Sequence, residues 1–136
     1  PPGCILPPES GTISTRNGSR MSDEHTTVAE LRRAMADFVS ARDWQQYHTP
    51  KNLAMSIAIE AAELMEHFQW YTPAEAEVRI GDPTLRHEIG EELADILLYC
   101  LSFANATGIE IADVVKAKME RNESRFPVQR VRGKLG

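Results

Sequence analysis

Residues 49–70 have the sequence TPKNLAMSIAIEAAELMEHFQW, in which Thr49 and Pro50 supply the side-chain cap and the first-turn proline of a long helix. The apolar side chains of this helix fall on two opposite sides, one holding Leu53, Ile57, Leu64 and Phe68 and the other Met55, Ile59 and Ala62. A helix that is apolar nearly all round is usually covered by neighbours on several sides. The segment therefore predicts a central helix in a helical fold.

Similar start and stop signals recur on both sides of this segment. Thr27 and Glu30 match a capping box, and the Thr-Pro start is repeated at Thr72 and, with aspartate, at Asp82. Gly108 and Pro127 are helix stops. These signals predict helices over residues 27–42, 49–70, 72–81, 82–108 and 111–125. No sustained alternation or hairpin signal indicates a strand, so the predicted fold class is all-α, with a four-helix-bundle-like protomer of antiparallel helices.

The two apolar sides of residues 49–70 also bear on assembly. Four helices of this length provide few neighbours to cover both sides, so a second subunit is the expected cover. We therefore expect oligomerisation to complete the bundle, in a homo-oligomer that is a dimer or a tetramer.

Length and composition are those of one globular domain. The chain has 136 residues, of which 42% are hydrophobic and 26% are charged. Residues 1–20 are rich in Pro, Gly and Ser and are expected to form an N-terminal extension, either a leader or an upstream read-through segment before Met21. Residues 21–127 form the predicted helical domain, and residues 128–136 form a basic C-terminal tail.

Charge and cysteine content exclude several classes of protein. The formal charge is −5, with +1 in residues 1–20 and +4 in residues 121–136, so residues 21–120 carry −10. This argues against a nucleic-acid partner, because duplex binding needs basic residues. If the ligand is a polyphosphate, we expect metal ions to mediate the contact. No apolar run approaches the roughly 18 residues of a membrane span. Two cysteines, Cys4 and Cys100, make no disulfide framework, so a cytoplasmic location is expected.

Carboxylates interrupt the apolar faces of the two longest predicted helices. Glu60 and Glu63 lie three residues apart, and Glu92 and Asp95 repeat that spacing. If these helices pack as antiparallel neighbours, the four carboxylates converge and repel one another, so a hard cation is their natural partner. Ligands that are all oxygen favour Mg²⁺, Mn²⁺ or Ca²⁺ over zinc.

Two other interpretations compete with a metal-dependent hydrolase. In the first, the acidic pairs are solvent-exposed and the chain is a non-catalytic helical oligomerisation or binding module. In the second, the bundle holds a di-iron centre, which requires Glu-x-x-His on two helices. Glu63 is followed at the third position by Glu66, and Glu92 by Asp95, so the spacing excludes iron.

The sequence resembles the all-α nucleoside triphosphate pyrophosphohydrolases, the MazG-like superfamily. EAAE at residues 60–63 and EELAD at residues 91–95 are similar to that family's paired EXXE and EXXD motifs. RDWQQYHTPKNL at residues 42–53, FQW at 68–70 and KMERNESRFP at 118–127 resemble its dCTP pyrophosphatase branch. The resemblance covers roughly residues 27–127.

This resemblance implies Mg²⁺-dependent hydrolysis of a nucleoside triphosphate between its α and β phosphates, with Mn²⁺ as a substitute ion. The implied substrate is dCTP or a related pyrimidine deoxynucleotide, and the products are the monophosphate and pyrophosphate. Glu60, Glu63, Glu92 and Asp95 become the metal ligands, and Glu63 is our choice for the general base.

The remaining matches are divided between the phosphates, the sugar and the base. The resemblance implies that Lys51, Lys118 and Arg125 counter phosphate charge and that Asn122 binds sugar or phosphate. It also implies that Trp44 and Trp70 line the base pocket, and Tyr99, one turn from Asp95, is expected to contact the sugar or an outer water. The alternative for these side chains is ordinary packing or surface charge. Met35 stands where vertebrate relatives carry a histidine facing the base, so broader deoxynucleotide use stays open.

Overall fold

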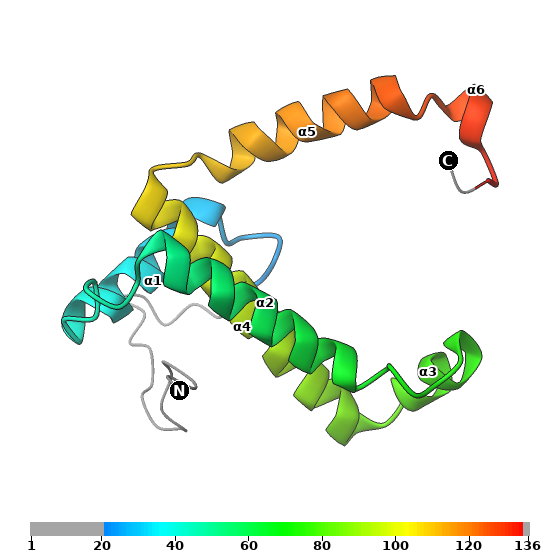
Figure 1. Ribbon diagram of the computed structural model, residues 1–136, viewed down its shortest axis with the longest axis horizontal. Coiled ribbons are helices and arrows are strands. Elements are labelled where there is room, and N and C mark those ends of the chain that lie inside the picture. Colours follow the sequence, from blue (N-terminus) through cyan, green and yellow to red (C-terminus); the bar gives the residue numbers. More distant parts are fainter. Residues whose placement is uncertain (1–20, 135–136) are drawn as a thin grey trace.

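The computed structural model describes residues 21–134, and every regular element among them is a helix. The predicted extension, residues 1–20, lies outside the described residues. Figure 1 shows the elements in chain order, which are α1 (Val28–Ala41), α2 (Pro50–Glu66), α3 (Pro73–Arg79), α4 (Pro83–Thr107), α5 (Ile111–Arg125) and α6 (Val128–Val131). The predicted all-α class is confirmed.

The helix starts follow the predicted caps. The Thr27 side chain accepts a hydrogen bond from the Glu30 backbone N–H and the Glu30 carboxylate accepts one in return, while Thr49 and Asp82 cap α2 and α4. At the far end of α4, Gly108 adopts a left-handed conformation with φ of 70°, which a residue without Cβ tolerates easily.

The end of α2 and the structure of the C-terminal segment differ from the sequence predictions. Helix α2 ends at Glu66 instead of about Trp70, because the chain tightens into a turn in which the Phe68 N–H donates to the Met65 carbonyl at 3.0 Å. This turn directs the chain into α3. In addition, the segment predicted as a basic tail contains the short helix α6.

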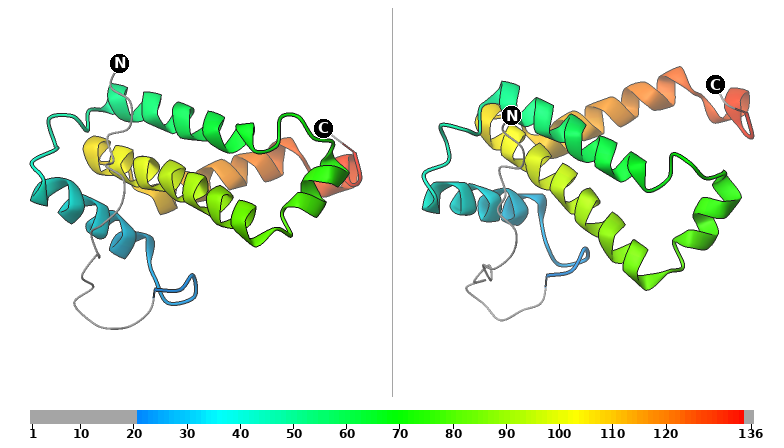
Figure 2. Two further views of the ribbon diagram at one scale, coloured as in Figure 1. Left: turned by 90° about the horizontal axis from the view of Figure 1, so that it is seen from below. Right: turned by 60° about the horizontal axis from the view of Figure 1, so that its bottom comes forward.

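The body of the molecule is an antiparallel pair of helices, α2 and α4, with α1 packed against α4 (Figures 1 and 2). Met35 and Val39 from α1 form a buried cluster with Leu101 from α4. Nearby, the buried His48 Nδ1 and the Ser102 Oγ lie 2.8 Å apart in a hydrogen bond that ties the start of α2 to α4. This small core fixes the register of the two helices that carry the acidic pairs.

Helix α5 leads away from the α2–α4 pair (Figure 1). Its first residue, Ile111, packs against the buried cluster formed by Met35, Val39 and Leu101. Large apolar side chains are exposed on the outer surfaces of three helices, namely Met55 and Ile59 on α2, Leu93 and Leu97 on α4, and Val114, Val115 and Met119 on α5. The second apolar side of α2 is thus uncovered within one protomer.

Within residues 21–134, no single helix is both long and apolar enough to cross a membrane, although α4 and α5 pass such a test together across a bend of 105°.

Candidate metal centre

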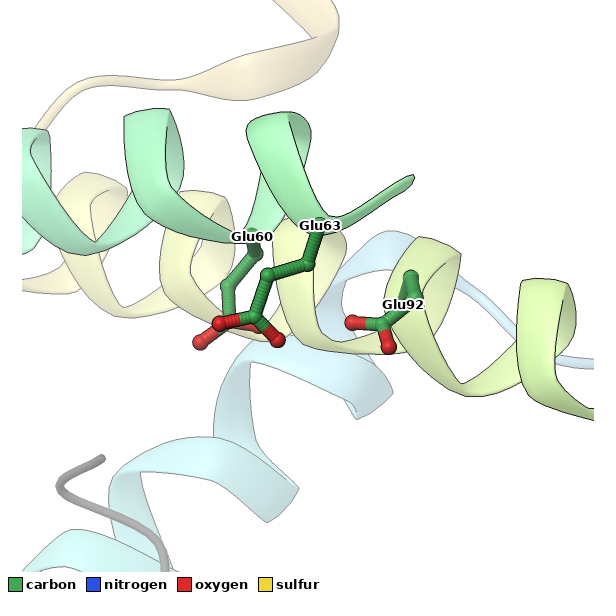
Figure 3. Close-up of side chains that lie close together, drawn as sticks. All are labelled: Glu60, Glu63 and Glu92. Carbon is green, nitrogen blue, oxygen red and sulfur yellow. The ribbon is translucent and has the colours of Figure 1, made fainter. Parts of the chain in front are cut away.

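Antiparallel packing of α2 on α4 brings acidic side chains from the two helices into one group. Glu60 and Glu63 extend from α2 and Glu92 from α4 toward a common space (Figure 3). A carboxylate oxygen from each of the three lies within 4.8 Å of the others. The structure therefore brings together three of the four residues that sequence reasoning chose as metal ligands.

The fourth residue, Asp95, lies one turn beyond Glu92 on the same helix and outside this compact group. It is close enough to act electrostatically, because its charge helps to raise the pKa of Glu60. Asp95 thus borders the group formed by Glu60, Glu63 and Glu92, which we call the carboxylate cluster.

Ionisation of all the carboxylates in and beside the cluster is energetically unfavourable. Glu60 is only 6% exposed, and burial, followed by the charges of Glu63, Asp95 and Glu92, raises its pKa to about 7. Burial and neighbouring carboxylates also raise the pKa values of Glu92 and Asp95. No lysine or arginine in the described part of the chain forms an ion pair with these four side chains.

The donor set fits a hard divalent cation. The three side chains of the cluster offer only carboxylate oxygens, which Mg²⁺, Mn²⁺ and Ca²⁺ accept and which zinc sites seldom use alone. A cation would also offset the repulsion and desolvation that raise the pKa of Glu60. The geometry and the electrostatics therefore point to the same kind of ligand.

One neighbour of the cluster was missed by sequence reasoning. The His67 Nε2 lies 4.0 Å from the Glu92 Oε1, and the coulombic effect of His67 partly opposes the raised pKa of Glu92. Its spacing was a usable signal, because His67 follows Glu63 by four residues and Glu60 by seven, which places all three on one side of the helix axis.

The two tryptophans predicted to line a base pocket are not brought together within one protomer. They lie beyond opposite ends of α2, whose 17 residues span about 25 Å. Trp44 is half-buried and packs edge-to-face on Phe38, with ring centroids 5.9 Å apart. Trp70 is 82% exposed in the turn after α2.

The predicted phosphate and sugar ligands are also dispersed. Lys51 is exposed in the first turn of α2, at the end of that helix away from the cluster. Lys118, Asn122 and Arg125 are exposed on α5, where their spacing places them on one face. Tyr99 is 1% exposed, one turn from Asp95. Met35 is buried among Val39 and Leu101, consistent with a packing role.

Fold and site together define a class of protein, in which two antiparallel helices of an all-α chain each contribute an acidic pair to one cluster. The model of the MazG-like family matches residues 55–133, a range that contains both acidic pairs. The chain belongs to the MazG-like family, as the sequence resemblance predicted.

Individual relatives agree with this assignment. The chain is 35% identical to dCTP pyrophosphatase 1 of Bos taurus over 123 residues, which is 90% of this chain and 73% of that protein. It is 35% identical to dCTP pyrophosphatase 1 of Mus musculus over 130 residues, 92% of this chain and 76% of that one. The crystal structure of a pyrophosphatase from Archaeoglobus fulgidus superposes with a TM-score of 0.69 and 40% identity, over 79% of this chain and 99% of that chain.

Proposed function

We propose that this protein is a Mg²⁺-dependent nucleoside triphosphate pyrophosphohydrolase that removes unwanted nucleotides from the cellular pool. The observation that carries the proposal is the convergence of Glu60, Glu63 and Glu92 within 4.8 Å on the α2–α4 pair of a MazG-like chain. Relatives named as pyrophosphatases favour this enzyme over a non-catalytic helical binding module.

The side chains divide the work of hydrolysis. The cation would be held by Glu60, Glu63 and Glu92, with Asp95 at the border of the cluster as the fourth proposed ligand. Mn²⁺ would substitute because it accepts the same oxygen donors. Bound Mg²⁺ supplies neutralisation of phosphate charge and orientation of the triphosphate.

Proton transfer is assigned to Glu63. Its carboxylate accepts a proton from the attacking water while the water oxygen bonds to a phosphorus beside the α–β bridging oxygen. The bond from that phosphorus to the bridging oxygen breaks, which yields the nucleoside monophosphate and pyrophosphate.

The proposed substrate is dCTP or a related pyrimidine deoxynucleotide, canonical or modified. Relatives named dCTP pyrophosphatase support this choice. Trp44 and Trp70 are the proposed stacking partners of the base, which would have to come from two copies of the chain because the two rings lie beyond opposite ends of α2. Tyr99 is the proposed neighbour of the sugar. Because the buried Met35 offers no directed hydrogen bond to a base edge, we expect other deoxynucleotides to be accepted as well.

A second copy of the chain is the proposed cover for the exposed apolar faces of α2, α4 and α5. Charge supports this arrangement, since residues 111–136 carry a formal charge of +4 whereas residues 21–110 carry −10. Docking of α5 onto a neighbouring α2–α4 pair would bring Lys118, Asn122 and Arg125 toward the phosphates and complete the helical bundle. The assembly is a dimer or a tetramer, with residues 21–127 as its folded domain. A cytoplasmic location without nucleic-acid partners stays a prediction.

The test is product analysis with a panel of canonical and modified deoxynucleotides. Ion-exchange chromatography should show dCMP and pyrophosphate from dCTP with Mg²⁺, and neither product in EDTA. Glu60→Gln and Asp95→Asn should abolish turnover while circular dichroism shows intact helix content. Glu66→Gln, which changes an exposed α2 glutamate outside the cluster, should behave as wild type.

Three results would contradict the proposal. The first is the absence of pyrophosphate from every nucleotide in the panel, which would favour the binding module. The second is turnover in EDTA equal to that in Mg²⁺. The third is near-wild-type turnover in both Glu60→Gln and Asp95→Asn, which would show that these carboxylates take no part in the mechanism.

A further inference from the structure

The side chain of His67 reaches across the helix pair toward the carboxylate cluster. It extends from the residue after the last turn of α2, and its Nε2 lies 4.0 Å from the Oε1 of Glu92 on α4. Both side chains are 21% exposed, so the contact is partly shielded from water. Among the contacts between basic and acidic side chains in residues 21–134, this is the one that involves a member of the cluster.

A carboxylate that binds a metal through one oxygen gains from a hydrogen bond to the other. Such a donor fixes the orientation of the ligand, and loss of partners of this kind typically weakens metal affinity by about 10- to 100-fold. A separation of 4.0 Å exceeds a hydrogen bond, so the proposed contact requires the side chains of His67 and Glu92 to approach each other when the cation binds.

We propose that His67 is a positioning residue for the cation, whose imidazole N–H holds one oxygen of Glu92 and leaves the other for the metal. The inference rests on the proposed metal-dependent function and adds a residue that the paired acidic motifs do not contain. The alternative is that His67 only holds α2 and α4 together. In that case its loss would lower the stability of the metal-free protein and leave the Mg²⁺ affinity of the folded protein unchanged.

The two roles are separated by measuring Mg²⁺ affinity without substrate. Isothermal titration calorimetry of the full chain with MgCl₂ gives the Kd of wild type, His67→Leu and His67→Gln. The glutamine amide N–H replaces the imidazole donor, whereas leucine does not.

His87→Leu is the matched control. The His87 Nε2 lies 3.4 Å from the Oε1 of Glu91, but His87 is exposed and this pair lies outside the cluster. Melting temperatures in EDTA report the stability of each metal-free variant.

We expect His67→Leu to raise the Kd for Mg²⁺ by about tenfold or more at an unchanged melting temperature in EDTA. His67→Gln and His87→Leu should stay close to wild type. The inference is overturned if His67→Leu binds Mg²⁺ as tightly as wild type, or if His67→Gln is as weak as His67→Leu. If the leucine variant does not fold, His67→Asn, whose amide is too short to reach Glu92, takes its place. A wild-type protein that binds no Mg²⁺ contradicts the proposed function itself.

Discussion

Glu60 is the residue whose surroundings most oppose its ordinary ionisation. It is buried, and three other carboxylates lie near it, so its pKa rises from 4.5 to about 7. The stability linked to this group is fully present below pH 4.5 and is lost as the pH rises through about 7. The raised pKa values of Glu92 and Asp95 act in the same direction.

The melting temperature of the metal-free protein should therefore fall by several degrees between about pH 5 and about pH 7.5. Glu60→Gln should flatten this fall and raise the melting temperature at the upper end, because glutamine removes the buried charge. Differential scanning calorimetry in EDTA measures both. An equally steep fall in the variant would show that Glu60 is not the group responsible.

The two tryptophans should respond differently to truncation. Trp70 is exposed, so Trp70→Ala should leave the melting temperature unchanged and raise the KM for dCTP by about tenfold, the loss expected for one stacked base. Trp44→Ala should lower the melting temperature as well, because Trp44 packs on Phe38 beside the core. An unchanged KM for dCTP in Trp70→Ala would show that Trp70 does not stack on the base.

At the scale of the helices, the residues at which the helices begin were predictable from the sequence, whereas some of the residues at which they end were not. The caps at Thr27, Thr49 and Asp82 are local chemistry that a few residues specify. The early end of α2 depends on how the chain connects to α3, and no residue among 67–70 is a typical helix stop that would have predicted it. The contact between His67 and Glu92 was not predicted, because it depends on the register of two helices, and spacing along α2 alone indicates only that His67 lies on the side of Glu60 and Glu63.

The bond between His48 and Ser102 fixes this register near the start of α2. Both side chains are buried, and His48 Nε2 has no hydrogen-bond partner within residues 21–134. Ser102→Ala would leave the imidazole without its described partner and should destabilise the fold by about 1–3 kcal/mol. Urea denaturation measures this loss, with Ser124→Ala on the exposed face of α5 as the control. A change in the free energy of unfolding no larger than the control's would contradict a role for this bond.

At the scale of the whole molecule, contacts within one protomer leave apolar side chains of α2, α4 and α5 exposed to solvent. The sequence predicted that both sides of α2 need cover, and α4 supplies it on one side only. How α5 is placed could not be predicted, because its start and stop signals specify a helix and say nothing about its partner.

The chain should be an oligomer at micromolar concentration in multi-angle light scattering. Ile59→Glu places a charge on the exposed apolar side of α2 and should give monomers that retain their helix content and lose activity. Val78→Glu, on α3, should remain oligomeric. A monomeric wild type that turns over dCTP would contradict the proposed assembly.

A single thermal-denaturation experiment tests whether the carboxylate cluster and the triphosphate bind the same cation. The melting temperature of the full chain is measured in EDTA, in Mg²⁺, and in each solution with a non-hydrolysable dCTP analogue. Mg²⁺ should stabilise the fold by roughly 2.7 kcal/mol at a hundredfold excess over its Kd, and the analogue should add to this only when Mg²⁺ is present. No shift with millimolar Mg²⁺, or equal stabilisation by the analogue in EDTA, would contradict a metal-bridged site.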